Sequence, residues 1–145
     1  WPNWHHTRGQ ALPDPLSTNT CQTSALFLAQ FLALRGVSAK IAQGNTPGKS
    51  EGYFDGTRWH GHAWVVVKNA GQGGELDAGH VTENGAEQDL ILDLTADQFG
   101  GPKTLMAPPH QLPQYRAGRI DTATKEAKAR RQTLVTEALK HIAAL

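Results

Sequence analysis

Apolar residues recur between about Thr20 and Arg35 at the spacing of an α-helix that is buried on most of its sides. A pattern this dense is typical of a helix enclosed by the rest of its domain, because an exposed face would carry polar residues. Gly36 follows, and glycine is the common residue just past a helix end. The sequence therefore predicts a helix over residues 20–35, whose apolar positions are Ala25, Leu26, Phe27, Leu28, Ala29, Phe31, Leu32 and Leu34.

Three later segments carry strand patterns. Residues 37–44 alternate in polarity and end in glycine, residues 62–68 are rich in valine, and residues 89–95 form a short apolar run. We expect the last two segments to pair as an antiparallel hairpin across the polar, glycine-rich residues 69–88. A connection of that length is more often functional or mobile than inert.

The rest of the chain divides into irregular segments and a final helix. Residues 1–17 are rich in tryptophan, histidine and proline without a period, and form an expected irregular arm. Glycine and proline predict loops over residues 45–60 and 100–119. Residues 121–145 carry apolar residues on one side of a helix and many lysines and arginines on the other. The order of helix, strand, strand pair and helix predicts an α+β fold.

Composition and charge narrow the classes of function. The 145 residues suffice for a single domain with a real hydrophobic core, and we expect its sheet to lie within residues 37–99. Hydrophobic residues make up 39% and the formal net charge is +1, which fits a soluble globular protein and argues against nucleic-acid binding through bulk electrostatics. No segment approaches the roughly 20 apolar residues that span a bilayer.

Two features bear on where the protein works. The first residues lack the basic-then-apolar pattern of a signal peptide, and there is no initiator methionine, so we expect a processed product or a domain of a longer protein. Cys21 is the only cysteine. A single cysteine excludes an internal disulfide and a cysteine-rich zinc site, and it favours a reducing compartment.

Cys21 stands at the start of the predicted helix. There the helix dipole and the free backbone N–H groups favour the thiolate, which is the nucleophilic form. The alternative is a small buried hydrophobe, the usual role of a free cysteine. The polar neighbours Asn19, Thr20, Gln22 and Thr23 are unusual around a core residue and favour a chemical role.

His62 and Asp93 can complete a site around Cys21. His62 opens the second predicted strand directly after a glycine, and Asp93 lies in a run of leucine and isoleucine. A carboxylate buried in such a run is costly without a partner. A bond from Asp93 to His62 satisfies the acid and fixes the tautomer of the imidazole. The three residues then supply a nucleophile, a base and a group that orients the base.

Other interpretations of these residues stay open. His62 can be a hydrogen-bonded strand-end histidine, and Asp93 can cap the turn that follows it, which leaves Asp97 as the second choice of acid. His60 and His62 alternate along the chain and could share a face, as a metal pair would. No carboxylate or third histidine lies nearby in sequence, so a further ligand would have to be His5, His6, His80 or His110. We expect neither a metal nor a cofactor.

Three motifs resemble, in the same order, those of the papain-like cysteine hydrolases, and within them of the transglutaminase-like group. They are the helix start at Cys21, the sequence His62-Ala63-Trp64 followed by three valines, and the strand sequence Leu92-Asp93-Leu94-Thr95. The resemblance covers roughly residues 18–99. It implies a papain-like fold, with a catalytic helix packed on a small antiparallel sheet and, in this chain, a further helix at the C-terminal end.

The resemblance also implies the reaction and the partners. Cys21 is the nucleophile, His62 the base and Asp93 the orienting acid. The thiolate attacks a carboxamide or peptide carbonyl, ammonia or an amine leaves, and water or a second amine resolves the thioester. Small domains of this kind resemble bacterial toxin or effector domains that deamidate glutamine side chains. That likeness implies a target protein as substrate, an immunity protein as a further partner, and action in a reducing cytoplasm after delivery within a longer secreted protein.

The oxyanion donors and the substrate contacts are less determined by the sequence. The backbone N–H of Cys21 is the first candidate for the oxyanion. The other candidates are the side chains of Asn19, Gln22 and Gln10 for the oxyanion and those of Trp64 and Gln98 for the substrate. The segment with Gln98 is also typical of a turn with a core phenylalanine at Phe99. A tryptophan just before the nucleophile, frequent in transglutaminases, is absent.

Two other classes of function stay open beside a cysteine amide hydrolase, for which we expect glutamine deamidation ahead of proteolysis and transamidation. One is a catalytically inactive papain-like module that binds a partner protein through its tryptophan-rich arm and cleft. The other is a metal hydrolase built on His60, His62 and one more histidine.

Overall fold

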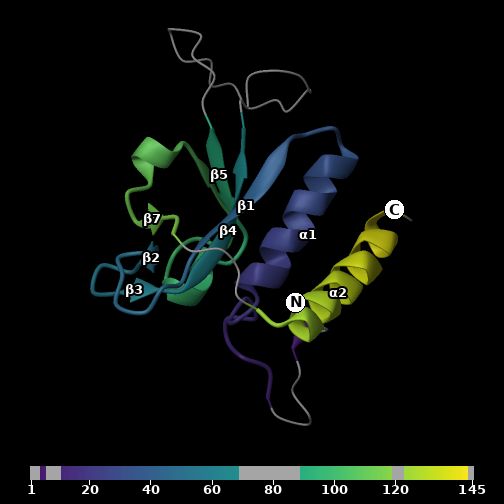
Figure 1. Ribbon diagram of the computed structural model, residues 1–145, viewed down its shortest axis with the longest axis horizontal. Coiled ribbons are helices and arrows are strands. Elements are labelled where there is room, and N and C mark those ends of the chain that lie inside the picture. The colour runs from purple at the N-terminus through teal and green to yellow at the C-terminus, as the bar shows by residue number, and fades with distance from the viewer. Residues whose placement is uncertain (1–3, 6–10, 69–88, 119–122, 144–145) are drawn as a thin grey trace, which may run out of the picture.

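The computed structural model describes residues 4–5, 11–68, 89–118 and 123–143. The elements in chain order are α1 (Cys21–Leu34), β1 (Ala39–Gly44), β2 (Gly52–Phe54), β3 (Trp59–His60), β4 (His62–Val67), β5 (Leu90–Asp93), η2 (Ala96–Phe99), β6 (Leu105–Ala107), η3 (Pro109–Gln111), β7 (Tyr115–Arg116) and α2 (Lys125–Ala143). The fold is α+β, as predicted, with antiparallel sheets and two long helices (Figure 1). None of the helices in these ranges combines the length and the apolarity required to cross a membrane. The connection predicted over residues 69–88 lies outside the described residues.

The larger sheet has the strand order β1-β4-β5-β6, and its neighbouring strands are antiparallel. The predicted hairpin is confirmed: β4 pairs with β5, and Val65 lies opposite Leu92. β1 borders the other edge of β4 and places Gly44 opposite His62. A strand between two neighbours and covered on both faces is apolar along its length, which explains the valines of β4. His62 is the first residue of this inner strand.

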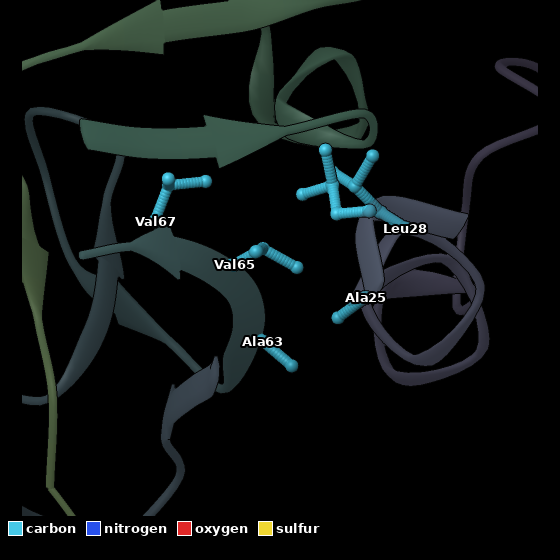
Figure 2. Close-up of a cluster of buried hydrophobic side chains, with 6 residues drawn as sticks. Ala25, Leu28, Ala63, Val65 and Val67 are labelled. Carbon is cyan, nitrogen blue, oxygen red and sulfur yellow. The ribbon is translucent and has the colours of Figure 1, made fainter. Parts of the chain in front are cut away.

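One face of the larger sheet packs against α1. Side chains alternate between the two faces of a strand, and the odd-numbered side chains of β4 point toward the helix (Figure 2). This core consists of Ala25, Leu28 and Leu32 from α1 and Ala63, Val65 and Val67 from β4. Cys21, the first residue of the helix, packs against its edge. The packing of α1 thus determines where Cys21 lies relative to β4.

The opposite face of the sheet carries a second, largely aromatic core. Its buried members are Tyr53, Trp64, Ile91, Ala96, Leu112 and Tyr115. His62 lies two residues before Trp64 on β4, and Asp93 lies two residues after Ile91 on β5. Residues two apart on a strand share a face, so His62 and Asp93 project together on the aromatic side of the sheet.

α2 forms an outer layer, so α1 lies between the larger sheet and α2 (Figure 1). Gln30 of α1 and Gln132 of α2 exchange side-chain hydrogen bonds of 2.8 and 3.2 Å. Val135 of α2 is fully buried. Covering α1 on both sides is the physical reason for its nearly all-round apolar pattern.

Two segments predicted as loops contain short strands, and here the prediction was wrong. Residues 45–60 include β2 and β3, and residues 100–119 include β6, η3 and β7. β6 extends the larger sheet beyond the predicted residues 37–99, and β3, β2 and β7 form a second sheet. Strands of two or three residues are too short to show alternation. They form because distant residues pair, such as Tyr53 with Tyr115.

Gly52 allows the second sheet to approach the first. Its φ is 97°, and a Cβ atom at this position would lie 2.7 Å from the carbonyl oxygen of Gly44 in the larger sheet. A Cβ atom on Gly44, at the end of β1, would lie 2.4 Å from the backbone nitrogen of Gly52. Only glycine fits such a contact. The contact places the next residue, Tyr53, with its ring 5.9 Å from that of His62.

Candidate active site

Cys21 is the first residue of α1, as predicted. The residue before it, Thr20, is the N-cap, but in the described part of the chain its side chain makes no capping hydrogen bond. The Thr20 hydroxyl instead donates to the carbonyl oxygen of Ser17 at 2.6 Å. The side chain of Thr20 therefore does not occupy the first-turn N–H groups of α1, among them that of Cys21. Cys21 itself is partly exposed, as a nucleophile must be.

The structure brings His62 and Asp93 into direct contact. Nε2 of His62 lies 2.6 Å from Oδ2 of Asp93, and the exposed fractions of the two side chains are 0% and 1%. Nδ1 of His62 is also buried, and among the described residues it has no hydrogen-bond partner. Nε2 of His62 is thus bound to Asp93, and Nδ1 is available to bind another group.

Asp93 accepts hydrogen bonds at both carboxylate oxygens. Oδ2 accepts from His62 and also from the hydroxyl of Tyr115 at 2.7 Å. Oδ1 accepts from the backbone N–H of Thr95 at 2.8 Å and from the Thr95 hydroxyl at 3.0 Å. Both sequence interpretations of Asp93 are present at once, because one oxygen caps the turn while the other binds the histidine. The four donors match the roughly four acceptor sites of an ionised carboxylate.

This bonding pattern assigns the tautomer of His62. An ionised carboxylate only accepts hydrogen bonds, so Nε2 of His62 must carry a proton. In the neutral imidazole the lone pair then lies on Nδ1. Nδ1 is therefore the atom of His62 that can remove a proton from a neighbouring group.

Charge and burial shift the pKa of His62 in opposite directions. Burial disfavours the imidazolium, but the interactions with Asp93 and then with Cys21 outweigh it and raise the pKa of His62 from 6.5 to about 9. Burial likewise disfavours the Asp93 carboxylate, but the bonds from His62, Tyr115 and Thr95 prevail and lower its pKa. The thiol of Cys21 contributes to the pKa shift of His62, although no hydrogen bond joins its sulfur to Nδ1 of His62 in this geometry. Catalytic hydrogen bonds are often long before substrate binds.

Aromatic rings enclose the pair on the second-core side. Tyr53 and Phe99 meet the His62 ring edge-on at centroid distances of 5.9 and 5.0 Å. Trp64, a predicted substrate contact, lies 6.0 Å from the His62 ring and 5.2 Å from that of Tyr115. Its Nε1 is buried and has no hydrogen-bond partner among the residues described. In this geometry Trp64 supports the rings around His62 and offers no accessible donor.

The short helix η2, which follows β5, is hydrogen-bonded to the segment before Cys21. Gln98 accepts a hydrogen bond from the backbone N–H of Asn19 at 3.2 Å and donates to the carbonyl oxygen of Thr95 at 2.9 Å. Asp97 accepts from the hydroxyl of Ser17. Asp97, the second choice of acid, is thus bonded to Ser17 in place of His62. Asn19 and Gln98 were predicted to contact the oxyanion or the substrate, and the structure places them at the junction beside Cys21.

His60 and His62 bind different carboxylates, although both rings contact Phe99. Nε2 of His60 lies 2.6 Å from Oδ2 of Asp55, and the ring of His60 stacks on Phe99 at 4.7 Å. This pair is partly exposed, at 21% and 20%, whereas the pair of His62 is buried. Within the described ranges no group of three histidine, cysteine, aspartate or glutamate side chains could hold a metal ion.

A groove of about 850 Å³ is lined by neighbours of the candidate site, although Cys21, His62 and Asp93 themselves do not line it. It is lined by Gln22, which follows Cys21, and by Tyr115, which donates a hydrogen bond to Asp93. Trp64 also contributes to its wall, and Lys40 and Arg131 contribute basic side chains. Gln22 is therefore placed at a surface that a substrate can reach, whereas Gln10, the remaining oxyanion candidate, lies outside the described residues.

Sequence reasoning gave no role to Tyr115, and it placed Thr95 only in the turn that Asp93 can cap. The contact of Thr95 had a local signal, since a threonine two residues after an aspartate favours a turn closed by the carboxylate. Tyr115 had none, because it reaches Asp93 from β7, a two-residue strand in a proline-rich segment.

Comparison of the chain with protein-family models, with curated proteins and with solved structures finds no match. The chemistry of the site is therefore the basis for assigning a function.

Proposed function

We propose that the protein is a cysteine-dependent amide hydrolase or acyltransferase of papain-like type, with Cys21 as nucleophile, His62 as base and Asp93 as the acid that orients it. The observation that carries the proposal is the buried 2.6 Å contact between His62 and Asp93, which leaves Nδ1 of His62 to interact with Cys21. A nucleophile, a base and an orienting group in this chain of contacts are what covalent acyl transfer requires.

The first half-reaction forms a thioester. Nδ1 of His62 takes the proton from the Cys21 thiol, and the thiolate sulfur attacks the carbonyl carbon of a carboxamide. The carbon becomes tetrahedral, and its oxygen takes the negative charge. The backbone N–H of Cys21, at the positive end of the α1 dipole, is our first candidate to bind that oxygen. The imidazolium returns the proton to the nitrogen, the C–N bond breaks, and ammonia leaves.

The second half-reaction releases a carboxylic acid. Nδ1 of His62 takes a proton from water, and the resulting oxygen nucleophile attacks the thioester carbon. The C–S bond breaks, and the sulfur of Cys21 regains a proton from the imidazolium. A glutamine side chain becomes a glutamate side chain in this sequence. An amine in place of water would give transamidation.

For the substrate we propose glutamine side chains of a target protein, in a domain that acts as a bacterial toxin or effector. The support is the resemblance of the Cys21, His62-Ala63-Trp64 and Leu92-Asp93-Leu94-Thr95 motifs to such enzymes. The groove beside Gln22 and Tyr115 offers a surface on which a protein segment can lie. An immunity protein that covers this groove would be a second partner.

The test of the catalytic pair is the rate of Cys21 alkylation by iodoacetamide as a function of pH, followed by intact mass. Only one cysteine exists, so a single label reports on the site. We expect wild type to show a rate plateau well below pH 8, because His62 stays protonated up to about pH 9 and stabilises the thiolate. His62→Ala should lose the plateau and show a rate that rises toward the ordinary thiol range near pH 8.5. His60→Ala, which removes the other paired histidine, is the matched control and should keep it.

A folded wild type without this plateau, or one whose profile is the same in His62→Ala, would refute the proposal and favour a catalytically inactive binding module. The substrate is tested separately, with a panel of glutamine-containing proteins. Ammonia release with a mass gain of about one dalton supports deamidation. Peptide fragments would identify a peptidase, and incorporation of an added amine would identify a transglutaminase.

A further inference from the structure

Tyr115 donates its hydroxyl proton to the same carboxylate oxygen that His62 uses. The distances to Oδ2 of Asp93 are 2.7 Å from the Tyr115 oxygen and 2.6 Å from Nε2 of His62. Tyr115 is 9% exposed and reaches this position from β7, in the second sheet. This hydrogen bond therefore joins the second sheet to the larger sheet, and its acceptor is a residue of the proposed active site.

We propose that Tyr115 is a positioning residue: its hydroxyl holds the Asp93 carboxylate ionised and directed at Nε2 of His62, so that Nδ1 stays available to Cys21. This inference rests on the proposed function and adds a fourth residue to its site. Tyr115 touches neither the thiol nor the substrate carbonyl in the reaction described above, so it acts through Asp93.

Burial and the neighbouring carboxylate keep the Tyr115 hydroxyl protonated, as a hydrogen-bond donor to Asp93. Burial first, and then the charge of Asp93, raise the pKa of the Tyr115 phenol, so it keeps its proton throughout the neutral pH range. Thr95 donates two hydrogen bonds to Oδ1 of Asp93. Oδ2 can accept two hydrogen bonds, one from the Tyr115 hydroxyl and the other from Nε2 of His62. A protonated Asp93 would have to displace one of these donors. The hydroxyl of Tyr115 therefore disfavours the acid form that would release His62.

Within the described part of the chain, the titratable groups that act on Asp93 come from three strands and from α1. His62 faces it from β4, Tyr115 from β7 and Tyr53 from β2, while Cys21 acts on the pair through His62. Tyr53 offers a matched comparison. It is as buried as Tyr115, and their rings meet edge-on at 5.1 Å, but in the described residues its hydroxyl makes no hydrogen bond to Asp93.

The experiment is the alkylation profile of Tyr115→Phe, with Tyr53→Phe as control. Removing the Tyr115 hydroxyl raises the pKa of Asp93, so the acidic end of the plateau should move to higher pH. We expect the acidic end to move up by about one to two pH units, the effect of losing one hydrogen bond to a charged group, while the rate near pH 8 stays within about twofold. Tyr53→Phe should leave the acidic end in place. Thermal unfolding of both variants establishes that they are folded.

A second measurement decides the matter if Tyr115→Phe does not fold. The chain has two tyrosines, so 3-fluorotyrosine supplied to cells expressing Tyr53→Phe labels position 115 alone. Fluorine makes the phenol a stronger donor, and the acidic end of the plateau should then move to lower pH. A structural role for Tyr115 predicts no such movement.

The outcomes separate this inference from the proposed function. A folded Tyr115→Phe with a wild-type profile, or a fluorinated protein with an unmoved acidic end, overturns the role of Tyr115 while the loss of the plateau in His62→Ala still supports the catalytic pair. If His62→Ala itself keeps the wild-type profile, the proposed function has failed and the positioning role fails with it.

Discussion

Nε2 of His62 and Oδ2 of Asp93 lie 2.6 Å apart at the meeting of two antiparallel strands, and solvent reaches neither side chain. A charge-assisted bond in such a dry environment is stronger than its equivalent at the surface. The same chain provides that equivalent, since His60 and Asp55 form a pair of equal length that is partly exposed. The exposed pair of His60 and Asp55 is therefore a control for the buried pair of His62 and Asp93.

Asp93→Asn should impair catalysis severely while the fold is retained. The amide can present its N–H to Nε2 of His62, which stabilises the wrong tautomer, and hydrolysis should fall roughly 10³- to 10⁴-fold. Loss of the Asp93 charge also lowers the pKa of His62, so the basic end of the alkylation plateau should move to lower pH. Asp55→Asn is the control and should change neither quantity. Turnover of Asp93→Asn at the wild-type rate would contradict the role given to Asp93.

The free energy of unfolding should depend on pH through His62. Its pKa is raised in the folded state from 6.5 to about 9, so its contribution is fully present below pH 6.5 and is lost as pH rises through about 9. The shift corresponds to about 3 kcal/mol, which urea titrations between pH 6 and pH 10 can measure. His62→Gln should remove most of this slope. An equally steep slope in that variant would assign it to other groups.

Asp93 makes the free energy of unfolding depend on pH in the opposite direction, at low pH. Its pKa is lowered in the folded state, so its contribution is present above the ordinary pKa of 3.8 and is lost as pH falls. Acid unfolding should therefore begin at higher pH in Tyr115→Phe than in wild type. Tyr53→Phe serves again as the comparison.

Asn19→Gly and Asn19→Val should differ sharply. Asn19 has a φ of 59°, a left-handed conformation that glycine adopts freely and a β-branched residue resists. Glycine also keeps the backbone N–H that binds Gln98. We expect Asn19→Gly to retain stability and the alkylation plateau, and Asn19→Val to lose about 1–2 kcal/mol of stability. A folded Asn19→Gly with intact alkylation but hydrolysis reduced about 100-fold would instead assign the Asn19 side chain to the oxyanion.

Leu28→Ala should destabilise the fold far more than Leu34→Ala. Leu28 is 9% exposed in the core between α1 and β4, whereas Leu34, on the same helix, is 72% exposed. Emptying the buried site should cost about 2–5 kcal/mol, and the exposed change about 0.5 kcal/mol or less. Chemical denaturation gives both values. Equal losses would mean that α1 does not pack on the sheet as described.

Much of the fold followed from local patterns. The helix from Cys21 to Leu34 and the hairpin of β4 and β5 were predicted within one or two residues, because long apolar runs have a clear period. The positions of Cys21 and His62 at the beginning of their elements were also predicted. The short strands were missed, since a two-residue strand exists only through its partner.

By itself, the sequence determined the α+β class, the helix start that carries the only cysteine, and the need of Asp93 for a partner within an apolar strand. These depend on composition and on neighbours along the chain. Only the tertiary structure decided that His62 is this partner, that Tyr115 and Thr95 complete the carboxylate, and that Asp97 binds Ser17 instead. Hydrogen bonds of this kind join residues up to 80 positions apart. They depend on which strands pair and which faces meet, and neither is encoded in a local period.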